Sequence, residues 1–214
     1  MRNLDLKDYP NLLDKVHLCQ IDVENALLSM KLQFFNVRNS KVEWRMKFPI
    51  FLGSFYRYIL RQQSVPSQKQ FWDMYLFDNT EWFNGQSLED EIMIALKARL
   101  FRTYPSLIRD LHFSLKLREC KLFGSVIYNA KLDVFEGVDV LITNKSSFYA
   151  VNLYTDTKNA FRGRKAKERR HSKFDNVFYI ELPVTFLDEN KHGDFFLYSD
   201  NSLILLKKEI CQKM

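Results

Sequence analysis

The chain has 214 residues, of which 46% are hydrophobic and 27% charged, with six Gly, five Pro and a net charge of +6. These values exclude an intrinsically disordered chain and allow one principal domain with an appendage. The apolar runs are interrupted before the ~18 residues of a membrane-spanning helix, and residues 1–10 lack a secretory apolar core, so we expect a cytoplasmic protein without membrane contact.

Residues 1–84 are predicted to form a helical region. Apolar residues recur near the helical period from Leu12 to Met30 and from Phe51 to Ile59, before the sequence SVPS interrupts the second run. A further helical segment is expected from residue 68. The aromatic side chains of this region are interpreted as core packing, because large rings at helical spacing fill protein interiors. We assign no chemistry to them, and we expect any protein partner to bind this region.

Residues 85–214 are predicted to form a second unit in which helices give way to strands. Ser87 and Asp90 form a capping-box pattern that predicts a helix to about Thr103, and a short helical piece is expected after Pro105. The tail is expected to form a hairpin from residues 194–198 and 203–207. Apolar runs predict four strands, at residues 122–128, 137–143, 147–154 and 177–182.

The positive charge is concentrated in one segment that follows the third predicted strand. Residues 158–173 contain eight basic residues and one acidic residue, a charge of +7, which leaves −1 for the rest of the chain. A localised charge of this kind is typical of a phosphate-binding surface, and the alternative interpretation is a solvated helix face. The residues expected to bind nucleic acid, DNA in particular, are Arg162, Arg164, Lys165, Arg169, Arg170 and Lys173.

Acidic residues and one lysine accompany the predicted elements in a recognisable order. Glu91, with Glu89 as the reserve, lies on the leading helix, and Asp139 lies early in a strand that follows a turn at Gly137. The tripeptide Asp156-Thr157-Lys158 ends the next strand. This order of elements and residues resembles the common core of the PD-(D/E)xK nuclease superfamily over about residues 87–183.

The resemblance implies an α/β (α+β) fold, in which a helical N-terminal region precedes a restriction-endonuclease-like mixed sheet flanked by helices. It also implies a metal-dependent nuclease, a DNA endonuclease in particular. Asp139, Asp156 and Glu91 would hold Mg²⁺ or Mn²⁺, since hard cations prefer oxygen ligands. Lys158 would orient or deprotonate the attacking water. The cysteines and histidines lack metal-ligand spacing, so no zinc site is expected.

One departure from the family pattern leaves alternatives open. The acidic-x-lysine motif usually lies inside the strand, where this chain has Asn152 and Tyr154. Asp156 and Lys158 either replace those groups slightly later in the strand, or the site is catalytically silent. Asp156 is also suited to cap a following helix, and Glu91 to favour a helix dipole. The alternative for Asp139 is a hydrogen-bonding role at the end of a turn. The alternatives to a nuclease are a noncatalytic nucleic-acid-binding protein with a degenerate nuclease fold and a protein-interaction subunit that uses the basic helix.

Overall fold

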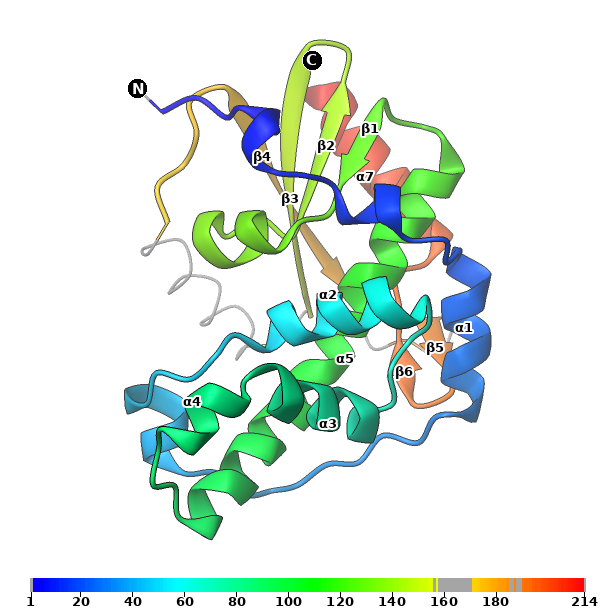
Figure 1. Cartoon of the computed structure of the whole chain (residues 1–214). Helices are drawn as coiled ribbons and strands as arrows, with labels where there is room; N and C mark the ends of the chain where they lie inside the picture. Colours follow the sequence, from blue (N-terminus) through cyan, green and yellow to red (C-terminus); the bar gives the residue numbers. More distant parts are fainter. Residues whose placement is uncertain (1, 156, 158–170, 185–186, 188–189, 214) are drawn as a thin grey trace.

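A computed structural model describes residues 2–155, 157, 171–184, 187 and 190–213. Helices make up the N-terminal part and a mixed four-stranded sheet follows (Figure 1), which confirms the α+β fold class. None of the described helices is both long and apolar enough to cross a membrane. The helices of the described part are α1 (Gln20–Ser29), α2 (Phe51–Gln62), α3 (Gln68–Asp78), α4 (Thr80–Asn84), α5 (Asp90–Cys120) and α7 (Asp200–Gln212).

The described strands and short helical turns complete the chain. The strands are β1 (Ser125–Ile127), β2 (Val140–Asn144), β3 (Ser147–Thr155), β4 (Val177–Val184), β5 (Lys191–His192) and β6 (Phe195–Phe196). Two turns are 3₁₀-helical, η1 (Leu6–Asp8) and η2 (Leu12–Lys15), and two are π-helical, η3 (Lys41–Arg45) and η4 (Leu132–Glu136). Strands β1 to β4 each overlap one of the four strands predicted from the sequence.

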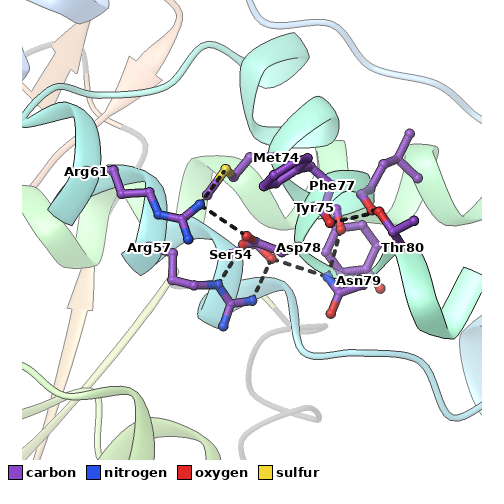
Figure 2. A network of polar contacts seen from close by, with 10 residues as sticks. Ser54, Arg57, Arg61, Met74, Tyr75, Phe77, Asp78, Asn79 and Thr80 are labelled. Atoms are coloured by element: carbon purple, nitrogen blue, oxygen red, sulfur yellow. Dashed lines mark hydrogen bonds and ion pairs between the residues drawn. The ribbon is translucent and has the colours of Figure 1, made fainter.

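Helices α2 and α3 are joined by a buried carboxylate at the end of α3. The side chain of Asp78 is only 4% exposed. Arg57 Nε, from α2, donates to Asp78 Oδ2 over 2.7 Å, and Arg61 Nη1 lies 3.6 Å from Asp78 Oδ1 (Figure 2). A carboxylate that leaves water needs charged or hydrogen-bonding partners. The two arginines therefore fix the end of α3 against α2.

Helix α5 is continuous for 31 residues and runs through Pro105. Proline has no N–H group, so the carbonyl of Phe101, four residues earlier, loses its helical donor. Gln68 Nε2, from α3, donates to this carbonyl over 3.1 Å in a buried position. The predicted break between Thr103 and Pro105 is therefore wrong, because a side chain from another helix supplies the missing donor.

Two further local predictions are wrong. The helix expected to start with a Ser87 capping box begins at Asp90 instead, with Glu89 as N-cap and no side-chain cap bond. The tail does not form the expected hairpin, because residues 200–212 form helix α7. Leu203, Leu206 and Ile210 are buried on α7, and their spacing of three and four residues follows the helical period.

The four strands lie in the order β1-β2-β3-β4. Strand β2 is antiparallel to both β1 and β3, whereas β4 is parallel to β3. A tight turn joins β2 to β3, and Lys145 in this turn has a left-handed φ of 53°. A parallel pair requires a long crossover connection. In this chain residues 156–176 connect β3 to β4.

Both faces of the sheet are covered. One face contributes Val140, Val151 and Leu182 to the main core, which also contains side chains of α5 and α7. The N-terminal segment, drawn in blue in Figure 1, covers the other face through Leu4 and Tyr9. The main core also contains side chains of α1, α2 and α3, so one core extends across the boundary expected at residue 84.

We expect Gln68→Ala to lower the free energy of unfolding by about 1–3 kcal/mol, because it leaves the buried Phe101 carbonyl without a donor. The same change should cost less in a Pro105→Ala background, where position 105 regains a backbone N–H for that carbonyl. Urea unfolding of the four proteins in this double-mutant cycle measures the coupling. Equal costs in the two backgrounds would contradict this account of α5.

Candidate functional site

Strands β2 and β3 separate at one end of the sheet. Their pairing ends at Val140 and Val151, whereas β3 stays paired with β4 as far as Thr155. Beyond Val151, no strand of the described residues pairs with this edge of β3. Backbone N–H groups at such an edge must find other partners when they are shielded from water. This is the end of the sheet at which the sequence places Asp139.

Asp139 lies directly before β2 and reaches across to β3. Its Oδ2 accepts a hydrogen bond from the backbone N–H of Leu153 over 2.7 Å, and the residue is only 8% exposed. The turn expected before Asp139 is present, since η4 ends at Gly137 with a φ of 70°. Glycine adopts this left-handed conformation without steric cost. The turn and the hydrogen bond together fix the position of the carboxylate.

An amide and a second carboxylate lie on the strands beside Asp139. Asn152 on β3 is opposite Glu181 on β4, and Asn152 Nδ2 donates to Glu181 Oε1 over 3.1 Å. Asp139 precedes Leu141 by two residues and Asn152 follows Ala150 by two. Since Ala150 belongs to the smaller core under the N-terminal segment, strand alternation along β3 places Asn152 on that face, whereas Asp139 precedes β2 and lies outside its alternation. Strands β3 and β4 and the residue before β2 thus bring oxygen-bearing groups to one end of the sheet.

Helix α5 contributes a further carboxylate near this end. Burial raises the pKa of Tyr128 and of Tyr198 well above the usual value for tyrosine, and the negative charges of Asp110 and Asp139 raise both pKa values further. The two carboxylates therefore act on the same two hydroxyl groups. Tyr198 Oη donates to the carbonyl of Leu182 on β4 over 3.0 Å. Both tyrosines stay neutral at physiological pH.

Glu91 is not brought to this end of the sheet. It is exposed in the first turn of α5, and Asn39 Nδ2 donates to its Oε1 over 3.3 Å. The reserve candidate, Glu89, is the N-cap of the same helix. Glu91 precedes Asp110 by about 29 Å along the helix axis, at ~1.5 Å per residue. Asp110 is the acidic residue of α5 whose charge acts on the same two tyrosines as the charge of Asp139.

Most of the predicted catalytic and nucleic-acid-binding residues after β3 lie outside the described residues. Lys173 is described and exposed, and its Nζ lies 5.0 Å from the ring centroid of Tyr179 on β4. The positions outside the described part are Asp156, Lys158, Arg162, Arg164, Lys165, Arg169 and Arg170.

The described residues alone do not form a complete metal site. Within residues 2–155, 171–184 and 190–213, no three His, Cys, Asp or Glu side chains group closely enough to hold an ion. Asp139, Asp110 and Glu181 offer the hard oxygen donors that Mg²⁺ prefers. A full set of ligands at this end of the sheet requires a contribution from outside the described part, where Asp156 lies.

Asp110 and Glu181 were not predicted from the sequence, although a usable signal was present. Asp139 attracted attention as a lone carboxylate inside an apolar strand, where an unpartnered charge is costly. The same criterion applies to Glu181 between two buried residues of β4, and to Asp110 in the buried stretch of α5.

We expect Asp139→Ala to destabilise the fold by about 1–3 kcal/mol, because the N–H of Leu153 loses its acceptor. Asp139→Asn should cost less, since the amide keeps an oxygen that can accept the same hydrogen bond. Thermal or urea unfolding of the two variants measures the difference. Equal stabilities would show that the hydrogen bond to Leu153 is not what Asp139 contributes to the fold.

Comparison with known proteins identifies no relative of this chain. No protein-family model matches the chain, and no curated protein and no solved structure matches it either. The function of the chain is therefore inferred from its own residues.

Proposed function

We propose that this chain is a metal-dependent nuclease that hydrolyses phosphodiester bonds, with DNA as its substrate. The observation that carries the proposal is the position of Asp139, a largely buried carboxylate fixed by Leu153 where β2 and β3 separate. The sheet supports it too, since a long helix, three antiparallel strands and a parallel fourth strand follow the order of the superfamily core. The basic residues 158–173 follow β3 directly in the sequence.

The expected cofactor is Mg²⁺ or Mn²⁺. Asp139 and Asp110 would hold the ion together with Asp156, and Asp110 takes the place predicted for Glu91. When bound, a divalent ion activates water and offsets negative charge on the scissile phosphate. The chain itself orients Asp139 through the Leu153 N–H, and Tyr128 and Tyr198 provide neutral groups beside the carboxylates. Lys158 would position the attacking water.

A noncatalytic nucleic-acid-binding protein is the second candidate, and one observation favours it. Asn152 occupies the strand position where the superfamily carries an acidic ligand, and its amide is hydrogen-bonded to Glu181. Tyr154 stands two residues later, where the lysine is usual. A site of this composition binds a divalent ion more weakly, because an amide replaces a carboxylate. Among the described residues, no comparable observation favours the interaction-subunit hypothesis.

We expect the wild-type protein to cleave DNA in Mg²⁺ or Mn²⁺ and to lose this activity in EDTA. Asp139→Asn and Asp110→Asn should each reduce the cleavage rate at least about 100-fold, because each removes a charged ion ligand. Glu91→Gln is the matched control on α5 and should cleave at the wild-type rate. Plasmid, linear and single-stranded DNA and RNA are compared in one gel assay.

Two results of this assay would contradict the proposal. Cleavage by Asp139→Asn at the wild-type rate would show that Asp139 is not a ligand of a catalytic ion. Binding of DNA by the wild type with no cleavage in either metal would support the noncatalytic alternative. Melting temperatures recorded beside activity separate loss of chemistry from loss of fold.

We expect the triple change Arg162→Gln, Lys165→Gln and Arg169→Gln to weaken binding to DNA of any sequence. The slope of log K against log salt concentration should fall by about 0.9 for each duplex phosphate that the variant no longer neutralises. A control that removes the same charge from α7 and its C-cap should bind like the wild type. This α7 triple variant changes the exposed residues Lys207, Lys208 and Lys213 to Gln. An unchanged slope in the first variant would show that these three residues do not neutralise phosphates and that the basic segment is a solvated surface.

A further inference from the structure

A short segment before α2 is clamped onto α5 by two arginines. This segment, residues 37–47, contains the turn η3 and is called the η3 segment below. Arg99 Nη1 donates to the carbonyl of Val42 and, over 2.9 Å, to that of Glu43. Arg102 donates to the Glu43 carboxylate, which lies partly buried between the segment and the helix. The backbone of the η3 segment is thus held in one place by α5.

With η3 held by Arg99 and Arg102, some of its side chains are buried and others are exposed to solvent. Val42 is fully buried, whereas Lys41, Trp44 and Arg45 are exposed. Trp44 is 87% exposed, the highest value among the large exposed hydrophobic side chains of the described residues. An indole gains little stability in that position, because its apolar surface stays in water. Trp44 therefore contributes little to the core, and its ring is available for contacts outside it.

A cationic groove of about 490 Å³ lies along the same segment. Its lining carries three positive charges and no negative charge, and the acidic residue of the η3 segment, Glu43, is paired with Arg102. Three acidic residues follow Leu88 directly in the sequence, Glu89 as the N-cap of α5 and Asp90 and Glu91 in its first turn. The lining residues are Lys41, Arg45, Met46, Lys47, Gln86, Ser87 and Leu88.

We propose that this groove binds single-stranded nucleic acid, with phosphates against Lys41, Arg45 and Lys47. A base stacks on Trp44, which precedes Arg45 in η3 and lies outside the groove lining. The inference rests on the proposed function for its class of ligand and adds a second binding surface remote from Asp139. Basic side chains that follow the backbone and an aromatic face that stacks a base are the two elements of single-strand binding. An acidic peptide would neutralise the lysines and the arginine but has no planar base to cover the indole.

The test measures binding of the full-length protein to a fluorescein-labelled oligothymidylate of about 20 nucleotides, longer than a ~4–16-nucleotide site. EDTA is present, so cleavage cannot interfere. Trp44→Ala should weaken binding about fivefold or more, the low end of one base–aromatic stack. The triple change Lys41→Gln, Arg45→Gln and Lys47→Gln should lower the salt slope by about 2, at ~0.7 for each phosphate of a single strand. The α7 triple variant is the charge-matched control and should bind like the wild type.

Intrinsic fluorescence gives an independent readout of stacking. The oligonucleotide should quench the wild-type tryptophan signal, and Trp44→Phe should abolish that quenching while Trp72 and Trp82 still fluoresce. Unchanged affinity and salt slope in the groove variants would overturn the inference. Quenching by a polyglutamate peptide and not by the oligonucleotide would overturn it as well, in favour of an acidic protein partner.

The outcome for the groove is separable from the outcome for catalysis. If the groove variants bind more weakly and the wild type does not cleave in Mg²⁺, the result supports the groove proposal and contradicts the proposed nuclease activity. If the wild type cleaves and the groove variants bind normally, the result supports the proposed nuclease activity and contradicts the groove proposal. Because Trp44, Lys41, Arg45 and Lys47 are exposed, the variants should melt at the wild-type temperature.

Discussion

The end of the β2–β3 pairing is the constraint on which the candidate site depends. A strand that loses its neighbour leaves backbone groups unpaired, and a protein interior tolerates few such groups. Here the acceptor is the carboxylate of Asp139, which replaces the missing strand at Leu153. The left-handed turn at Gly137 makes this reach sterically feasible. One hydrogen bond thus completes the sheet and orients a charged group at its open end.

Helix α5 connects this end of the sheet to the rest of the molecule. It carries Asp110 toward the sheet, and it carries Arg99 and Arg102 toward the η3 segment. A break at Pro105 would let the part of α5 that carries Asp110 move relative to the part that carries Arg99 and Arg102. The hydrogen bond from Gln68 to the Phe101 carbonyl therefore helps to fix the relative position of the two parts. The aromatic N-terminal helices therefore support the frame that positions both surfaces.

The sequence predicts those features that depend on local pattern. Apolar runs indicated the four strands of the sheet, and a lone carboxylate in an apolar run indicated Asp139. The continuity of α5 was missed because the partner of Phe101, Gln68, is distant in sequence and only packing brings it close. Asp110 and Glu181 were missed for a similar reason, since the path of α5 and the register of β4 decide which carboxylates meet. Local propensity contains neither quantity.

The spacing of the two proposed surfaces limits how one nucleic acid can use both. Leu88 lines the groove just before α5 begins, and Asp110 lies about 30 Å further along the helix at ~1.5 Å per residue. A single strand bound in the proposed groove would therefore be a part of the substrate that flanks the bond cleaved near Asp139. In the proposed function, the basic residues that follow β3 in the sequence neutralise the phosphates nearest to the reacting bond, and the proposed groove holds the flanking single strand.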